Sequence, residues 1–415
     1  MNLAWVSIAA LVVAVVLSCV TTINVGLLSL ALAMVIGVYL GGMPLSAVTA
    51  DFPVPLFITL VSVTLLFSIA EANGTLARLT ARAVRLCRGH AGLLPVMFFI
   101  LGFVLATIGA GATPASALLA GPAMAVAHRA GVPLLLMALM TGNGALAGTL
   151  SPFAPTGIVA NGVMARIGLG GVEWQTFALN ALAHTIVGVG GFLIFGGWKL
   201  FSERGRTVAA EAPADPMEAR HWLTACGMAL LILAVAVFRF DVGLVALVMA
   251  VSLVLLRAVD ESAAIKAMPW GVIMMVTGVT VLIALLEETQ GLALITRGIA
   301  QVSTPQTVAA VVAFGTGLVS VYSSTSGVVL PAFLPMAPEL AQHLGGMNPL
   351  SIAWAMNVSA SLVDLSSLST VGAMYIAAAP PGSDARRLFN QLLAWGLGMT
   401  IVGAALCWML FGIRA

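Results

Sequence analysis

Charged side chains are scarce in this sequence. Only 17 Lys and Arg and 15 Asp and Glu occur among its 415 residues, so 8% of the chain is charged, whereas about 25% is usual for a soluble protein. Hydrophobic residues make up 61% of the chain. This composition predicts an all-α polytopic membrane protein whose main surroundings are the lipid bilayer.

Two further shortages narrow the function. The formal net charge is only +2, which gives no basis for binding nucleic acid. The 4 cysteines lie far apart and without CxxC spacing, at Cys19, Cys87, Cys226 and Cys407. They indicate neither a disulfide framework nor a cysteine metal site. We expect them to pack as small hydrophobic residues.

The hydrophobic segments follow a plan that repeats. Apolar spans of about 17 to 25 residues are expected near 3–21, 24–41 and 53–72, and again near 221–237, 241–257 and 269–288. A short arm follows each set, at 75–89 and at 289–303. In the first arm Arg78, Arg82 and Arg85 share one helix face, which is typical of a helix lying at the membrane surface.

Each half then has two interrupted segments. Two segments, 91–129 and 304–343, each contain an interruption rich in small residues. The residues on either side of the interruption are too few for two full crossings of the membrane. We therefore expect two re-entrant hairpins, each with its tip at the interruption. Residues 132–168 and 348–380 are too long for one span and are interrupted near Pro152 and Asp364, which predicts two broken helices. Last spans are expected at 174–198 and 387–411.

These segments predict two inverted repeats. We expect about ten transmembrane helices, five in residues 1–198 and five in 221–415, with a charged linker at 199–220. Because five is odd, the repeats must have opposite orientations. If the first arm is cytoplasmic, 13 of the 17 basic residues lie inside, as the positive-inside rule requires, and four lie outside: Arg166, Arg239, Arg297 and Arg414. We therefore expect a multi-pass protein of the inner cell membrane with a cytoplasmic linker.

The two hairpins and two broken helices occupy corresponding places. Aligning Pro122 with Pro331 superimposes the hairpins at a separation of 209 residues, and Asn143 and Asn357 then begin the broken helices at similar positions. Paired interruptions of this kind indicate the substrate site of a transporter near the middle of the bilayer.

Part of the chain resembles a known family. Residues Pro53 through Met164, which include FPVPLFITLVSVTLLFSIAEANGT, GATPASALLAGPAMAVA and TGNGALAGTLSPFAPTGIVANGV, resemble the N-terminal domain of the MatC-type malonate and dicarboxylate carriers. The whole plan is similar to the divalent anion/sodium symporters of the ion transporter superfamily. The resemblance implies a homodimer, scaffold and transport domains, a dicarboxylate bound at the hairpin tips and an elevator-type movement. Where those symporters carry Ser-Asn-Thr, this chain has Ala112-Thr113-Pro114 and Tyr322-Ser323-Ser324.

The candidate substrate site has no cation of its own, because no Lys or Arg lies in a predicted tip or break. Half-helices are expected to begin near Ala115 and Thr325, and their free N–H groups suit carboxylate oxygens. The expected substrate-binding residues are those of the two tips: Thr113, Pro114, Ser116, Ser323, Ser324, Thr325 and Ser326. The alternative is that these small residues only allow close helix packing.

Sodium ions are the expected source of positive charge, and no other cofactor is expected. The candidate sodium ligands lie in the broken helices: Asn143, Ser151, Asn357, Asp364 and Ser366. Asp364 carries the most weight, since a carboxylate within an apolar span is usually functional. It can bind a cation, carry a coupling proton, or cap a half-helix near Ser366 or Ser367. We expect His184 to be a satisfied interhelical residue rather than a proton relay, and Asn180 to serve packing.

The sequence thus predicts a secondary active transporter of small dicarboxylates such as malonate, malate or succinate, with cation-coupled symport. The rival is a proton-coupled transporter or antiporter that uses Asp364 on the same scaffold. We do not expect an enzyme. In particular, a serine hydrolase of the Gly-x-Ser-Gly type is disfavoured because Ser324 stands where the first glycine is needed before Ser326.

The orientation can be tested by cysteine labelling in a variant from which the native cysteines have been removed. A cysteine placed in the linker at 199–220 should be protected from impermeant thiol reagents in intact cells, whereas one added after Arg414 should react. The opposite labelling pattern would contradict the inverted repeats.

Overall fold

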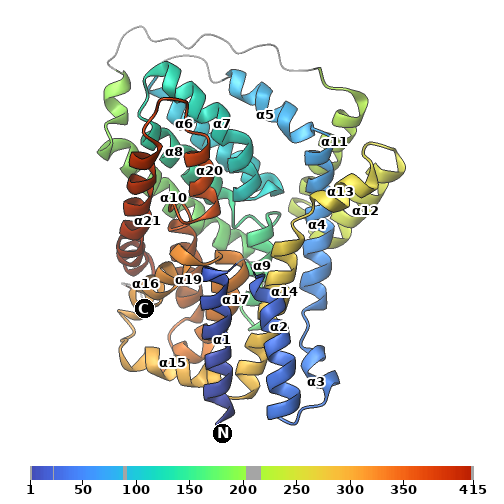
Figure 1. Cartoon of the computed structure of the whole chain (residues 1–415), viewed down its shortest axis with the longest axis vertical. Helices are drawn as coiled ribbons and strands as arrows, with labels where there is room; N and C mark the ends of the chain where they lie inside the picture. Colours follow the sequence, from blue (N-terminus) through green and yellow to red (C-terminus); the bar gives the residue numbers. More distant parts are fainter. Residues whose placement is uncertain (1, 22, 87–90, 202–215, 413–415) are drawn as a thin grey trace.

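The computed structural model describes residues 2–21, 23–86, 91–201 and 216–412, and within these ranges all regular secondary structure is helical. Figure 1 shows a bundle whose two halves are interleaved rather than side by side. Most of the predicted linker, residues 202–215, lies outside the described residues.

The first half contains these elements, in which η marks a π-helical or 3₁₀ segment: α1 (Leu3–Val20), α2 (Val25–Val35), η1 (Ile36–Leu40), α3 (Leu45–Ala50), α4 (Val54–Ala72), α5 (Thr75–Leu86), α6 (Leu93–Leu105), η2 (Ala106–Ala110), α7 (Ala112–Ala130), α8 (Leu134–Gly148), α9 (Pro155–Arg166), α10 (Glu173–Ile194) and η3 (Gly197–Phe201).

The second half contains α11 (Ala219–Ala236), α12 (Val242–Leu255), α13 (Glu261–Ala267), α14 (Trp270–Glu288), α15 (Gly291–Gln301), α16 (Val308–Tyr322), η4 (Thr325–Val329), α17 (Leu330–Phe333), η5 (Leu334–Met336), α18 (Ala337–His343), α19 (Pro349–Leu362), α20 (Thr370–Ala377), α21 (Ala385–Cys407) and η6 (Trp408–Gly412).

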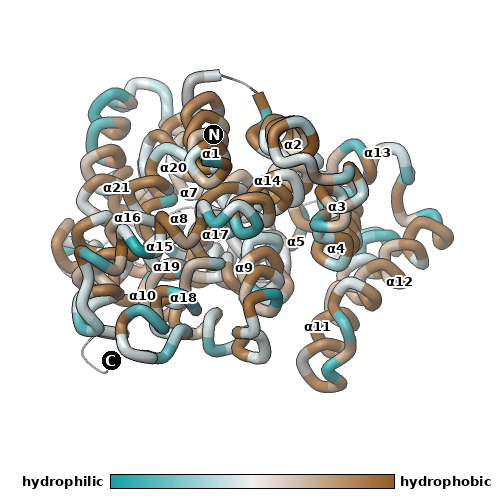
Figure 2. Tube along the Cα trace, turned by 90° about the horizontal axis from the view of Figure 1, so that it is seen from below, coloured by the Kyte–Doolittle hydropathy of each residue, from teal (hydrophilic) through white to brown (hydrophobic). Residues whose placement is uncertain are grey.

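Several of these helices have the length and apolar character of membrane spans. Five described segments meet both criteria: Val54–Ala72, Leu93–Ala110, Glu173–Ile194, Trp270–Glu288 and Ala385–Gly412. Shorter apolar helices accompany them. Figure 2 shows apolar residues along the peripheral helices α11 and α12, where Leu255 is 77% exposed. Outer surfaces of this kind suit contact with lipid.

Two helix crossings use a glycine in the same way. In α2, a Cβ on Gly26 would lie 2.1 Å from the Met274 carbonyl oxygen of α14. In α12, a Cβ on Gly243 would lie 3.0 Å from Thr59 Oγ1 of α4. Small residues let membrane helices approach closely. These crossings join α2 to α14 and α12 to α4, so each half contributes one helix to each pair.

Each hairpin also packs against a helix of the other half. The first hairpin, α6 to α7, packs along α8, and its return helix α7 lies against α20 of the second half. In the second hairpin α16 packs along α19, while η4 and α17 lie against α9 of the first half. The two hairpins enter the bundle from opposite ends (Figure 1) and their tips approach each other near its middle.

Glycine shapes the first tip. Gly109 and Gly111 have φ values of 122° and 80°, which L side chains rarely adopt. A Cβ on Gly109 would also lie 2.2 Å from the Phe67 ring. The return helix therefore begins at Ala112, three residues before the expected Ala115, because the backbone completes its reversal at Gly111. The second half-helix begins at Thr325 as expected.

The structure corrects the alignment of the halves. The residues that precede the returning half-helices are Gly111 and Ser324, separated by 213 residues. The broken helices begin at Leu134 and Pro349, separated by 215. Pro122 and Pro331 are therefore not equivalent. Asn143 corresponds to Val358 rather than to Asn357, since a shift of one residue turns a helical side chain by about 100°.

The two breaks themselves match closely. In the first, the Ala154 N–H donates to the Ser151 carbonyl at 2.9 Å, and in the second the Ser369 N–H donates to the Ser366 carbonyl at 3.0 Å. A Cβ on Gly157 or on Gly372 would lie 2.0 Å from the Ser151 or Ser366 carbonyl oxygen, respectively. The second half of each broken helix is therefore seated directly on the preceding turn.

This close contact predicts that glycine-to-alanine changes differ in their effect on the stability of the fold. Gly157→Ala and Gly372→Ala should each destabilise the fold by about 1–3 kcal/mol, because backbone must shift to admit the methyl group. Gly121→Ala in α7 is the control, since a Cβ there meets nothing within 4 Å and alanine favours a helix. Thermal unfolding of the purified variants measures the effect. Equal unfolding temperatures for all three variants would contradict the described breaks.

Candidate functional site

A cavity of about 340 Å³ lies where the two tips and the two breaks meet; we name it the tip cavity. Its lining is rich in hydroxyl groups from all four segments: Thr113, Thr149, Thr156, Ser323, Ser324, Thr325, Ser326, Ser369 and Thr370. Asp364 and Tyr322 add the remaining side-chain oxygens, and Asn24 adds an amide. Residues more than 300 positions apart in the chain thus share one site.

The structure brings half of the predicted site residues into this cavity. Thr113, Ser323, Ser324, Thr325, Ser326 and Asp364 line it. The others do not: Pro114, Ser116, Asn143, Ser151, Asn357 and Ser366 lie outside its lining.

Three of the residues outside the cavity hold its walls in place. Ser116 is buried in α7 and accepts a long hydrogen bond from Tyr375 Oη of α20, at 3.4 Å. Ser151 Oγ donates to the Thr107 carbonyl at 2.7 Å and so ties the first break to the first tip. Ser366 Oγ accepts the Leu368 N–H at 3.3 Å within the second break.

The two asparagines are used differently from the expectation of a matched pair. Asn143 is fully buried, and its amide donates to the Leu139 carbonyl at 2.9 Å while its oxygen faces His184 at 3.0 Å. Asn357 faces Met164 Sδ at 3.4 Å, and among the described residues its Oδ1 has no hydrogen-bond partner. Both ring nitrogens of His184 have partners, as expected for an interhelical histidine.

Asp364 lies in a group of oxygen atoms that we name the oxygen cluster. Thr325 Oγ1 lies 2.7 Å from Asp364 Oδ1, 2.5 Å from Ser320 Oγ and 3.1 Å from the Ala360 carbonyl oxygen. Ser320 Oγ also lies 3.4 Å from Asp364 Oδ1. The cluster joins the second tip to the second break, just as the hydrogen bond from Ser151 to Thr107 joins the first break to the first tip.

Asp364 does not cap the following half-helix. Ser369 fills that role, since its Oγ accepts the Gly372 N–H at 3.1 Å at the start of α20. The described hydrogen bonds of the Asp364 carboxylate come from the hydroxyls of Thr325 and Ser320 instead. The alternative of a cap through Ser366 or Ser367 is therefore wrong.

The electrostatics of the tip cavity are unusual for an anion site. Among its described lining residues none is Lys, Arg or His, and Asp364 is the one carboxylate. The start of α7 has Gly111 before it and no side-chain cap, so its first N–H groups are available to an anion. The cavity thus offers hydroxyl and backbone donors, together with one negative charge.

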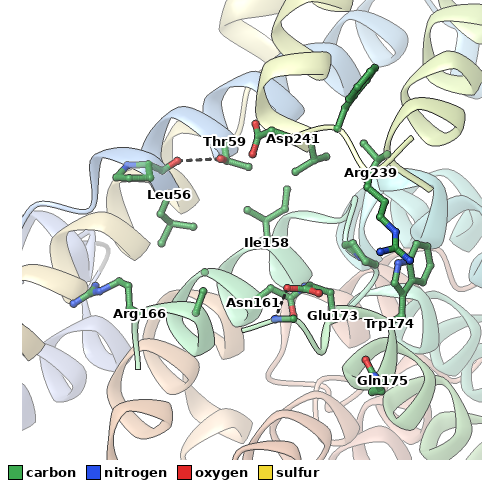
Figure 3. A pocket seen from close by; sticks show the side chains of 18 of the residues that line it. Leu56, Thr59, Ile158, Asn161, Arg166, Glu173, Trp174, Gln175, Arg239 and Asp241 are labelled. Carbon is green, nitrogen blue, oxygen red and sulfur yellow. Dashed lines mark hydrogen bonds between the residues drawn. The ribbon is translucent and has the colours of Figure 1, made fainter. Parts of the chain in front are cut away.

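A second, larger cavity has a different character. It measures about 1230 Å³, lies between α4, α9, α10 and the α11–α12 turn, and contains none of the predicted site residues (Figure 3). Its charges are mixed, with Arg166 on one side and Arg239 and Glu173 on the other. Pro152 lines it, whereas Thr149 and Thr156 line the tip cavity, so the first break separates the two cavities.

Sequence reasoning missed several lining residues. Thr149, Thr156, Ser369 and Thr370 flank the breaks, and the hydroxyl groups beside each interruption were a usable signal. Asn24 gave no such signal. It caps α2 through the Gly26 N–H at 2.9 Å and reaches the cavity only because the α1–α2 turn lies beside the tips.

Comparisons with known proteins agree with this picture. Residues 1–149 match the family model described as the N-terminus of the dicarboxylate carrier protein MatC. The comparison with curated proteins gives no match. Among solved structures, the Alcanivorax borkumensis YdaH transporter is similar, with a TM-score of 0.58 and 16% sequence identity over 91% of this chain and 89% of that one.

At this identity the structural similarity establishes a shared fold. The match over residues 1–149 confirms the resemblance noted in the sequence. The N-terminal part of the chain therefore matches the MatC dicarboxylate carrier family, and the chain as a whole shares the fold of the YdaH transporter.

Proposed function

We propose that this protein is a secondary active transporter that carries small dicarboxylates, such as malonate, malate or succinate, across the inner cell membrane together with a cation. The observation that carries the proposal is the tip cavity, where two tips and two breaks present hydroxyl and backbone donors. Paired helix interruptions near the middle of a membrane protein are typical of transporter sites.

The size and donors of the cavity favour a small dicarboxylate. At about 340 Å³ it is at the lower end of the range of about 300–1,000 Å³ for ligand sites. The first tip contributes Thr113 and the free N–H groups at the start of α7, and the second tip contributes Ser324 and Ser326. We infer that each tip receives one carboxylate.

The charge of the cavity favours a coupled cation. A dianion beside the Asp364 carboxylate would gather three negative charges with no described cationic side chain in the lining, and a buried charge needs a partner. Carboxylate, hydroxyl and carbonyl oxygens, as in the oxygen cluster, are suitable ligands for a hard cation. We propose sodium bound by Asp364, Thr325, Ser320 and the Ala360 carbonyl. A proton on Asp364 is the rival.

We also propose ten spans in two inverted repeats. Asn24 and Asp241 support this because they cap α2 and α12, respectively, and are separated by 217 residues, as are Gly26 and Gly243 at the two glycine crossings. The second, larger cavity is consistent with the proposed orientation, since Arg166 and Arg239, which are both expected outside, line it together.

The proposed movement is of the elevator type within a homodimer, as the resemblance implies. The tip cavity supports a moving contact, because α14 contributes Met275 and the α1–α2 turn contributes Asn24 to a site otherwise built from tips and breaks. Gly327 of the second tip packs on the Met275 side chain, which would lie 2.1 Å from an added Cβ. Such a small residue suits a surface that must slide.

Uptake into proteoliposomes tests the proposal. Malonate, malate, succinate and citrate are offered under an imposed sodium gradient or an imposed proton gradient, with protein-free vesicles as the control. We expect concentrative uptake of at least one small dicarboxylate, driven by sodium. Uptake that follows only the proton gradient favours the rival, and no uptake of any dicarboxylate under either gradient contradicts the proposal.

Asp364→Asn separates the two coupling ions. If Asp364 binds sodium, the loss of its charge should lower the apparent sodium affinity at least about tenfold with little change in pH dependence. If it carries the proton, proton-driven net uptake should stop while substrate exchange continues, because exchange requires no net proton release. Net uptake and exchange are measured in the same vesicles. Asp260→Asn, at the exposed cap of α13, is the control. Unchanged coupling would remove Asp364 from the mechanism.

A further inference from the structure

Helix α10 carries two polar residues, Asn180 and His184, that lie one helical turn apart and are fully buried. The helix packs between α8 and α19, the first halves of the two broken helices. Neither residue lines the tip cavity. Their hydrogen bonds nevertheless reach both breaks.

Asn180 joins the ends of the two half-helices. Its amide nitrogen donates to the carbonyls of Leu146, at 2.9 Å, and Ala147, at 3.2 Å, in the last turn of α8. Its oxygen accepts from Ser361 Oγ of α19 at 2.6 Å. The first contact lies just before Thr149, and the second lies directly after Ala360, whose carbonyl belongs to the oxygen cluster.

His184 makes a parallel connection. One ring nitrogen lies 3.0 Å from Asn143 Oδ1 of α8, and the other lies 3.2 Å from Ser361 Oγ. Both asparagine amides are oriented by backbone carbonyls, because Asn143 Nδ2 donates to Leu139 at 2.9 Å and Asn180 Nδ2 donates to α8. Both asparagine oxygens therefore face the network as acceptors.

The hydrogen atoms of this network do not suffice for all of its contacts. Three contacts link Asn143 to His184, His184 to Ser361 and Ser361 to Asn180. A neutral histidine supplies one hydrogen and Ser361 supplies one. The network therefore has three arrangements, each of which leaves one contact without a hydrogen atom. In two of them Ser361 donates to Asn180, while His184 donates either to Asn143 or to Ser361. In the third, Ser361 donates to His184, which then donates to Asn143. The Ser361 hydroxyl also lies 3.0 Å from the Val358 carbonyl oxygen, which is a further acceptor.

We propose that Asn180, His184 and Ser361 are positioning residues that couple the occupancy of the oxygen cluster to the shape of the first break, and so to substrate affinity. The inference rests on the proposed cation-coupled function. A cation held by Asp364 and the Ala360 carbonyl pulls on the last turn of α19, which moves the Ser361 hydroxyl. A change of arrangement makes or breaks the hydrogen bond from His184 to Asn143 of α8, and so alters how α8 is held before Thr149. A two-state element biased by both sites is what coupling requires.

The repeat architecture does not by itself demand this network. At the separation of 215 residues that relates the broken helices, Asn180 and His184 correspond to Trp395 and Met399 of α21. Helix α21 also packs on α19. The polar pair is therefore a property of the first half alone.

Ser361→Ala tests the coupling, because it removes the one hydroxyl that every arrangement uses. Ser359→Ala is the matched control on the same helix. Ser359 is also fully buried, but its hydroxyl donates to the Ala313 carbonyl of α16. The measurement is the dissociation constant of malonate for the purified, folded full chain with and without saturating sodium, at constant ionic strength and repeated across pH.

In the wild-type protein the cation should tighten malonate binding by a factor in the usual range of about 5–150 for coupled sites. Ser361→Ala should lower that factor at least about fivefold, while Ser359→Ala keeps it within about twofold. A folded Ser361→Ala variant with the wild-type factor overturns the inference, as does an equal loss in both variants.

A second readout does not depend on the substrate. Thr156→Cys, in a cysteine-free background, places a label at the start of α9, directly after the first break. Its rate of modification is measured with and without sodium. Sodium should change this rate, and the added Ser361→Ala change should abolish the difference. If no dicarboxylate binds but the sodium effect on labelling depends on Ser361, the proposed substrate fails and the coupling stands. No effect of sodium on labelling overturns the coupling.

Discussion

The structure depends on one constraint. Irregular backbone within an apolar membrane protein must find hydrogen-bond partners inside the protein, because lipid supplies none. Each hairpin tip meets this constraint by bonding to the break beside it. The Ser151 hydroxyl donates to the Thr107 carbonyl of the first tip, and the Thr325 hydroxyl of the second tip is shared between Asp364 Oδ1 and the Ala360 carbonyl. The same bonds that satisfy the backbone thus bring four distant segments around one cavity.

Equivalent positions in the two breaks carry different chemistry. Thr149 and Asp364 are separated by 215 residues, the separation that relates the broken helices, and both line the tip cavity. The first break presents a hydroxyl where the second presents a carboxylate. The halves therefore share a backbone plan, while the charge that a cation would balance belongs to the second half. The polar pair on α10 reaches from this charged side to the uncharged one.

The sequence was a good guide to the kind of element and a poor guide to register. Proline, glycine and serine interruptions marked both hairpins and both broken helices, because these residues remove donors or relax the backbone. The exact match of the halves was missed, since the second tip contains the π-helical segment η4 and a return limb interrupted by proline. Asn143 and Asn357 looked paired for that reason. Ser320 and Asn24 were not foreseen, because only the packing of α16 and of the α1–α2 turn brings them to the site.

The lack of a described cationic side chain around the tip cavity also affects whether the proposed substrate could cross the membrane without its coupling ion. A compartment that crosses the low dielectric of the bilayer carries a Born energy that grows with the square of its net charge. In the proposed elevator movement, the tip cavity with an ionised Asp364 and a dianion alone would carry three negative charges, whereas the empty cavity carries one, and each accompanying cation would remove one of them. The energy of the crossing would then disfavour the movement of the proposed substrate without its coupling ion. A cavity that held arginines would lose this safeguard, since the bound dianion alone would neutralise them.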